Sequence, residues 1–335
     1  MPNRRRVLAG LAACALPVPS VLAQAKTEIS ISRQPGILYM PTHVIEKRGL
    51  VEKHAARLGV RAPKVAWVNF AGGGAQQDAL LSGSVDMINT GTGNLLLLWD
   101  RTRGGVKGIA ASSAQPLGLV TREDRIRTLE DFRPGDKIAV PTVKVSTQAI
   151  LLQMAAGRMF GAARVGHFDD LTVQLSHPDA YAALRNAAHE VRSHFAAPPF
   201  QFYALKNVPG ARQIATSAEI IGGPLTQGQF FATTRFADAN PAFVRAVRAA
   251  AEEAKAAIES ETRACVETYR EVTGDRTDTG EILDLLAQPG MMEWNIHPQG
   301  TMKFAAHLHA IGTLRTAPAS WRDYYLPVAH DLPGG

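Results

Sequence analysis

The sequence predicts an α/β protein of two lobes, each built on a central, mostly parallel sheet flanked by helices. Short apolar strands alternate with helical stretches in the first third of the chain, and the alternation begins again after residue 117. From residue 241 onward the sequence reads almost entirely as helix. A chain of 335 residues, of which 46% are hydrophobic and 20% charged, is long enough for two packed units of this kind.

The first 25 residues read as an export signal in front of these lobes. Arginines at positions 4–6 precede a short apolar stretch, 7–16, and a small-residue cleavage site at 23–25. This apolar stretch is far shorter than the ~20 residues that a membrane-spanning helix needs. We expect a periplasmic protein that is exported by the general secretory route or, because of the adjacent arginines, by the twin-arginine route. Lipid anchoring at Cys14 is the less favoured alternative.

Four strands are expected in the first unit, and each of the first three leads into a turn and a helix. They are residues 27–32, 64–70, 85–89 and 108–113. The spacing of Val44, Ile45 and Leu50 indicates one helix over about 41–53. Glycine-rich segments at 71–75 and 90–94 are expected as loops, with helices at 76–82 and from Asn94 onward.

The second unit repeats the pattern, and the last third adds helices. Its strands are expected at 117–121, 137–140 and 191–196, and its helices at 145–160 and 181–188. Asn240 and Pro241 suit the N-cap and first position of a long alanine-rich helix ending near 261. Further helices are expected at 262–273, 279–287 and 299–314. We expect the chain to return to the first lobe at 229–234 and to pack these helices there.

The candidate ligand-binding residues are glycines, hydroxyl side chains and a few neighbours at the ends of predicted strands. In open α/β sheets, ligands bind at the carboxyl ends of strands, beside the first turns of helices. Free N–H groups and the positive end of the helix dipole favour an anionic group there, and they also suit a neutral polar one. The candidates are Gln34, Tyr39, Gly73, Gly74, Thr90, Thr92, Gly93, Ser113, Thr142, Ser146, Thr147, Pro198 and Phe200.

Several other chemistries are not indicated. The glycines do not have nucleotide-binding spacing, no serine sits in a nucleophile elbow, and no histidines have zinc-binding spacing, so we expect no catalytic residue, cofactor or metal. The net charge is +6, and three of these charges lie in the export segment, so nucleic-acid binding is not expected. Cleavage leaves Cys265 as the one cysteine, which excludes an internal disulfide.

Several segments resemble the substrate-binding proteins of nitrate, sulfonate and taurine ABC transporters. The stretches beginning Gln34-Pro-Gly, Trp67-Val-Asn-Phe-Ala-Gly-Gly-Gly and Ala79-Leu-Leu-Ser-Gly look like the family's first lobe. Residues 129–141 look like the start of its second lobe, and 318–323 like its C-terminal end. The sequence departs from the family at 188–191, where a small-residue continuation is usual. The resemblance covers nearly the whole mature chain and is unspecific for the ligand.

The resemblance implies a type II periplasmic binding fold with two crossovers between lobes. The first lobe would comprise 26–115 with 228–335 and the second 116–227, and they would close around the ligand. The implied function is the solute-binding component of an ABC importer, a monomer that delivers a small polar solute, neutral or anionic, to a membrane permease. Sulfonates, nitrate, taurine and related organic acids are the implied ligands.

Two alternatives use the same fold. One is an exported enzyme, and the other is a sensor module, in either case for a pyrimidine-type or aromatic-acid ligand. A related branch of fungal enzymes forms a pyrimidine with a cysteine-rich motif. The single mature cysteine, Cys265, departs from that motif and disfavours the enzyme.

Overall fold

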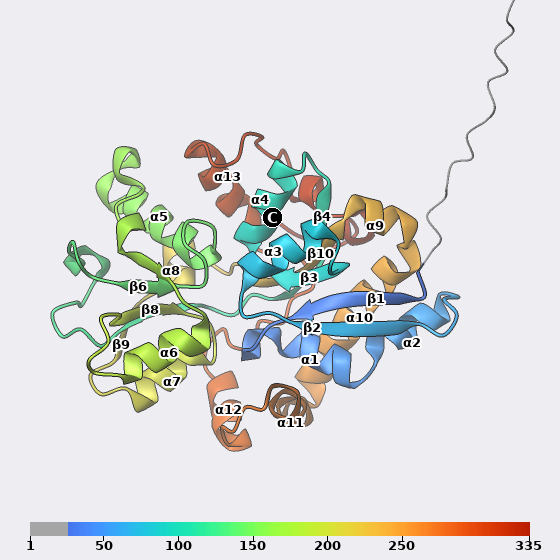
Figure 1. The fold of residues 1–335 in the computed structure, drawn as a ribbon, viewed down its shortest axis with the longest axis horizontal. Helices are drawn as coiled ribbons and strands as arrows, with labels where there is room; N and C mark the ends of the chain where they lie inside the picture. Colours follow the sequence, from blue (N-terminus) through green and yellow to red (C-terminus); the bar gives the residue numbers. More distant parts are fainter. Residues whose placement is uncertain (1–25) are drawn as a thin grey trace, which may run out of the picture.

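The computed structural model describes residues 26–335, whose strands form two separate five-stranded sheets (Figure 1). The first sheet has the order β2-β1-β3-β10-β4 and the second the order β7-β6-β8-β5-β9. We call the parts built around these sheets the first lobe and the second lobe. The chain crosses between them after β4 and returns before β10. The predicted two-lobed α/β class is therefore confirmed, whereas the residue boundaries of the lobes stay a prediction.

The elements of the two lobes have the following bounds. The strands of the first sheet are β1 Glu28–Arg33, β2 Lys64–Asn69, β3 Met87–Thr90, β4 Val106–Ser113 and β10 Gly228–Thr233. Those of the second sheet are β5 Gly118–Thr121, β6 Ile138–Val140, β7 Thr172–Gln174, β8 Ser193–Ala196 and β9 Arg212–Thr216. The α-helices are α1 Met40–Lys47, α2 Leu50–Arg57, α3 Gly73–Ser82, α4 Thr92–Arg101, α5 Thr147–Phe160, α6 His177–Arg185, α7 Phe200–Asn207, α8 Ser217–Ile221, α9 Thr234–Ala239, α10 Pro241–Ser260, α11 Thr262–Thr273, α12 Thr279–Leu286 and α13 Thr301–Ala310. Short 3-10 turns lie at Ile37–Tyr39, Leu129–Asp131, Ala162–Arg164, Asp169–Leu171, Trp321–Tyr324 and Pro327–Ala329.

Both sheets are parallel except for one strand in each. β10 runs antiparallel to its neighbours β3 and β4. In the second sheet, β5 runs antiparallel to β8 and β9. These two strands are the first that follow each crossover, so the reversal marks where the chain changes lobe. The other pairs, β1 with β2 and β3 and β6 with β7 and β8, are parallel.

Helix α10 fixes the late part of the chain to the first sheet. Ala246, Ala250 and Ala254 recur every fourth residue and are completely buried. Their small side chains let α10 approach α2 and the sheet closely, and Figure 1 shows α10 beside α1 and α2. Helix α10 is thus part of the core that covers the first sheet.

The structure corrects several predicted elements. The expected helix over 41–53 is two helices, because Gly49 adopts a left-handed conformation with φ of 57°. α3 begins at Gly73, inside the stretch expected as a loop. α6 begins at His177 because Ser176 caps it and accepts a hydrogen bond from the Asp179 amide. β7, β9 and α7 were not anticipated.

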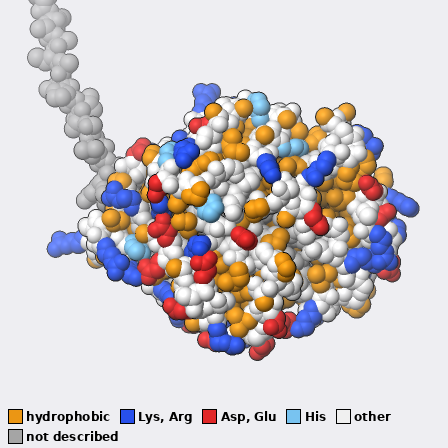
Figure 2. Space-filling model, turned by 180° about the vertical axis from the view of Figure 1, so that it is seen from behind, with side chains coloured by type: hydrophobic (Ala, Val, Ile, Leu, Met, Phe, Trp, Pro, Cys, Tyr) orange, Lys and Arg blue, Asp and Glu red, His pale blue; other side chains and the backbone are white. Residues whose placement is uncertain are grey.

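Charged side chains of both signs are interspersed on the face of the molecule in Figure 2, over a surface that also exposes scattered hydrophobic groups. Within residues 26–335, none of the helices is long and apolar enough to cross a membrane. The predicted export segment and Cys14 lie outside the described residues.

Candidate functional site

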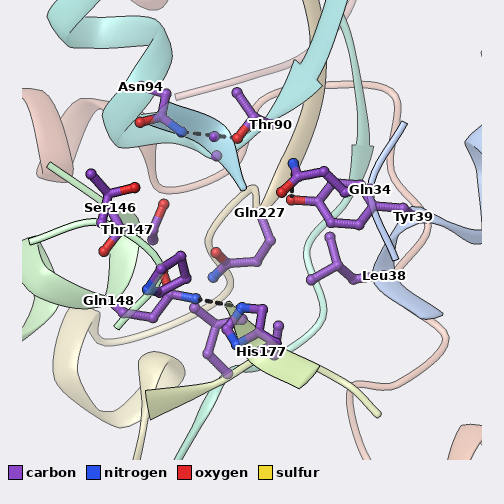
Figure 3. A pocket seen from close by; sticks show the side chains of 16 residues that line it. Gln34, Leu38, Tyr39, Thr90, Asn94, Ser146, Thr147, Gln148, His177 and Gln227 are labelled. Atoms are coloured by element: carbon purple, nitrogen blue, oxygen red, sulfur yellow. Dashed lines mark hydrogen bonds between the residues drawn. The ribbon is translucent and has the colours of Figure 1, made fainter. Parts of the chain in front are cut away.

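One cavity lies between the lobes and is lined from both of them (Figure 3). The lining residues are Gln34, Leu38, Tyr39, Gly73, Thr90, Gly91, Asn94, Leu117, Pro141, Thr142, Ser146, Thr147, Gln148, His177, Ala197 and Gln227. The cavity is small, about 40 Å³, which corresponds to about three water molecules. The lobes therefore have to move apart before a larger solute can enter.

Three helices begin at this cavity. Gly73 is the first residue of α3, Gly91 is the N-cap of α4, and Ser146 is the N-cap of α5. The first amides of each helix lack intrahelical partners and carry partial positive charge. Their convergence makes the cavity favourable for oxygen atoms that accept hydrogen bonds.

The wall from the first lobe is a hydrogen-bonded network of neutral side chains. The Gln34 amide donates to the Tyr39 hydroxyl at 2.8 Å and to the Asn89 carbonyl at 3.1 Å. The Asn94 amide donates to the Thr90 hydroxyl at 2.8 Å. Burial raises the pKa of Tyr39 far above its usual range, so the phenol stays neutral. These bonds fix the side chains before any ligand arrives.

The wall from the second lobe contains a neutral histidine. Nδ1 of His177 lies 2.8 Å from Nε2 of His194, and its Nε2 lies 3.3 Å from the Gln148 amide nitrogen. Phe200 stacks on the His177 ring, with centroids 5.8 Å apart. Enclosure by protein lowers the pKa of His177 to about 4 and that of His194 well below its usual value. Both rings are therefore uncharged at neutral pH.

Two buried polar atoms of the cavity lining have no protein partner. They are the Thr147 hydroxyl oxygen and the Gln227 amide nitrogen. A buried polar group without a partner costs about 1–3 kcal/mol. A polar solute in the cavity would remove this cost, so both atoms indicate a ligand-binding site.

All of the residues that line the cavity are uncharged at neutral pH. The arrangement can hold a solute through amides, hydroxyls and helix N-termini, without an ion pair. Among residues 26–335 there is no group of three or more His, Cys, Asp or Glu side chains that could hold a metal ion.

Glycines let the lobes meet closely beside the cavity. A Cβ atom added at Gly93 would lie 2.7 Å from the Val145 carbonyl oxygen and 2.7 Å from Cδ1 of Ile150. One added at Gly91 would lie 2.6 Å from the Thr147 hydroxyl. All three distances are shorter than van der Waals contact permits, so a larger side chain at either glycine would push the lobes apart.

A second contact between the lobes lies away from the cavity, and we call it the tyrosine latch. The Tyr203 hydroxyl of α7 donates to the Asp275 carboxylate at 2.9 Å and accepts from the Thr277 hydroxyl at 2.8 Å. Tyr269 of α11 donates to the same carboxylate oxygen at 2.9 Å. An ion pair of 2.7 Å between Lys206 of α7 and Glu281 of α12 adds a further contact between the lobes. Figure 1 shows α7 next to α12 at the lower edge.

The structure brings seven of the thirteen candidate residues to the cavity. They are Gln34, Tyr39, Gly73, Thr90, Thr142, Ser146 and Thr147. Gly74 and Gly93 lie where the lobes touch, against Thr142 and Ile150. Whether these residues bind ligand stays a prediction.

The other four candidates do not line the cavity. Thr92 donates its hydroxyl to the Thr226 carbonyl, and Ser113 is buried beside the crossover. The Pro198 carbonyl accepts from the Ile37 amide across the lobes, and Phe200 supports His177.

Four polar lining residues, Asn94, Gln148, His177 and Gln227, were not anticipated as ligand contacts. Asn94 was expected only as the start of a helix. Gln148 follows the predicted pair Ser146-Thr147 directly, so the first turn of a helix that points at the cleft was the available signal. Gln227 immediately precedes the returning strand. His177 had a readable signal in the capping pattern Ser176-His-Pro-Asp, which places it in the first turn of a helix.

Solved structures similar to this chain are periplasmic binding proteins. The alkanesulfonate-binding protein SsuA from Xanthomonas axonopodis pv. citri, bound to MOPS, is 21% identical over 88% of this chain and 96% of that one, with a TM-score of 0.69. The periplasmic aliphatic sulphonate binding protein SsuA from Escherichia coli is 19% identical, covering 90% and 92%, with a TM-score of 0.65. The periplasmic nitrate-binding protein NrtA from Synechocystis PCC 6803 is 16% identical, covering 89% and 84%, with a TM-score of 0.65.

These likenesses show that the chain has the periplasmic binding protein fold, as the resemblance implied. No protein-family model matches the sequence, and no curated protein matches it. The fold alone does not assign a function.

Proposed function

We propose that the chain is the solute-binding component of an ABC importer and that it captures a small polar solute in the cavity between the lobes. An anion such as a sulfonate, nitrate, taurine or a related organic acid fits best. One observation carries the proposal: the starts of three helices and two unpartnered polar atoms, contributed by both lobes, converge on one uncharged cavity.

Fold neighbours support the same role. Their names describe binding of alkanesulfonates, aliphatic sulfonates and nitrate, and two of the three names state that the protein is periplasmic. We therefore propose that residues 1–25 direct export to the periplasm and that a membrane permease receives the solute. A monomer is sufficient, because both walls of the cavity come from one chain.

A ligand panel tests the proposal directly. Thermal unfolding of the mature chain is measured with ethanesulfonate, taurine, nitrate, short carboxylates and pyrimidines. A ligand present at 100 times its dissociation constant stabilises the folded protein by about 2.7 kcal/mol. We expect stabilisation by at least one of the anions, and none by any compound would contradict the proposal. A new product detected by mass spectrometry would indicate an enzyme instead.

A further inference from the structure

The cavity wall contributed by the second lobe contains a chain of three hydrogen-bonding side chains, Gln148, His177 and His194. His194 does not line the cavity, is completely buried, and meets the ligand site only through His177. Neither imidazole is charged at neutral pH, so each carries one proton on one of its two nitrogens. Where these protons lie decides whether the wall offers a donor or an acceptor.

Only two proton arrangements satisfy the contact of 2.8 Å between the rings. In the first, His177 donates from Nδ1, so His194 must carry its own proton on Nδ1. Nε2 of His177 then accepts from the Gln148 amide nitrogen, which leaves the Gln148 oxygen for the ligand. In the second, His194 donates from Nε2 and His177 carries its proton on Nε2. The Gln148 oxygen, with the amide turned over, then accepts a hydrogen bond from Nε2–H of His177, and the Gln148 NH₂ group faces the ligand.

Burial favours the second arrangement. Nδ1 of His194 is buried and has no hydrogen-bond partner. The first arrangement would leave an N–H donor stranded there, whereas the second leaves only a bare lone pair. Orphaned buried N–H groups are rare in native proteins, and unsatisfied acceptors are somewhat less rare. The helix N-termini on the same cavity also favour a ligand that accepts hydrogen bonds.

We propose that Gln148, His177 and His194 form a relay in which His194 donates to His177 and His177 donates to Gln148. The Gln148 NH₂ group then faces the cavity and selects a ligand atom that accepts a hydrogen bond and cannot donate one. The inference rests on the proposed function and adds a specificity element to it. Gln148 is the residue that touches the ligand, and the two histidines position it. A solute that presents an N–H or O–H group at this wall meets a donor and is rejected.

Two measurements test the relay. Nitrogen-15 NMR of the histidine side chains, with resonances assigned through His177→Gln and His194→Gln, reports which nitrogen carries each proton. We expect Nε2–H on both rings of the wild-type chain. A proton on Nδ1 of either ring overturns the relay, and this readout needs no ligand.

The second measurement compares ethanesulfonate with ethanesulfonamide, which is uncharged and has a donating NH₂ group in place of one accepting oxygen. The charge difference contributes equally in wild type and variant, so the change in preference reports Gln148. In the wild-type chain the sulfonate binds more tightly. Gln148→Leu should reduce the ratio of the two dissociation constants about tenfold, because one hydrogen bond to a charged group is lost. The exposed control Gln213→Leu should keep it. An unchanged preference in Gln148→Leu overturns the relay, whereas absence of binding to any compound of the panel, with the expected Nε2–H protons, overturns the proposed function alone.

Discussion

Single side chains decide how tightly the cavity holds a solute. Gln227 presents an amide nitrogen that no protein atom satisfies, and it is 4% exposed. We expect Gln227→Leu to weaken binding of an anion about tenfold, because one donor to a charged group is lost. Gln227→Glu should weaken it further, because a carboxylate would face the anion. Isothermal titration checks both variants, with the exposed Gln288→Leu as control. Equal affinity in all four proteins would contradict the site.

Gly93 gives a second test at the same scale. It lies inside helix α4, where alanine is the better helix former by about 1 kcal/mol. Its added Cβ would nevertheless collide with Val145 and Ile150 of the second lobe. We expect Gly93→Ala to leave the lobes folded but to lower ligand affinity at least tenfold, as measured by titration.

A matched control for Gly93→Ala exists in the second lobe. Gly157 lies inside α5, and a Cβ there would meet only Val165 at an ordinary 3.8 Å. Gly157→Ala should raise the melting temperature and leave affinity unchanged. If both glycine variants bound ligand normally, the close approach of the lobes would not matter for binding.

At the scale of elements, the tyrosine latch joins α7 to the segment between α11 and α12. The hydrogen bonds to Asp275 outweigh the effect of its burial, and they hold its pKa below the usual range. We expect Tyr203→Phe to weaken ligand binding about three- to tenfold without touching the cavity, because the closed population falls. Tyr181→Phe removes a hydroxyl from the neighbouring helix α6 and is the control. Small-angle scattering should show a larger radius for ligand-free Tyr203→Phe, and an unchanged radius and affinity would rule out the latch.

The elements also show what a sequence can predict. Strands and their glycine-rich ends were found because alternation and glycine spacing are local properties, and these features led to seven cavity residues. The break at Gly49 was missed because the apolar spacing continues on both sides of it. Gln148, Gln227 and His177 were missed because the orientation of a polar side chain depends on which lobe faces it. The helix was predicted to begin at residue 181, four residues after the true start of α6, so the position of His177 in its first turn was missed.

At the scale of the whole molecule, enclosure by protein keeps His43, His177 and His194 of residues 26–335 neutral, and this predicts the response of stability to acid. Burial lowers the pKa of His43 to about 3 and that of His177 to about 4, and lowers that of His194 well below its usual value. An unfolded histidine has a pKa of about 6.5, so the unfolded chain binds more protons below that pH. Stability is therefore complete above pH 6.5 and falls as the pH drops toward 4, by up to about 1.4 kcal/mol per pH unit for each ring.

Urea unfolding of the ligand-free chain at pH 7.5, 6 and 5 checks this dependence. His43 donates to the Gln34 carbonyl at 3.1 Å, and a glutamine can keep that bond. His43→Gln should therefore remove the contribution of one histidine ring to the pH dependence of the free energy of unfolding. The exposed Gln213→Leu removes no titratable group and should leave the dependence unchanged. Constant stability between pH 7.5 and 5 would contradict the burial of neutral rings.

The antiparallel strand β10 has a consequence for the order in which the chain becomes structured. It lies between β3 and β4 in the first sheet, yet it follows them by more than a hundred residues. As the polypeptide emerges from a ribosome, β5 to β9 are all complete at Thr216, before β10 begins at Gly228. The second sheet can thus assemble from one continuous segment, whereas β4 cannot pair with β10 until residues 228–233 have been synthesised. We expect early fragments that end before residue 228 to hold an ordered second sheet beside an unfinished first one.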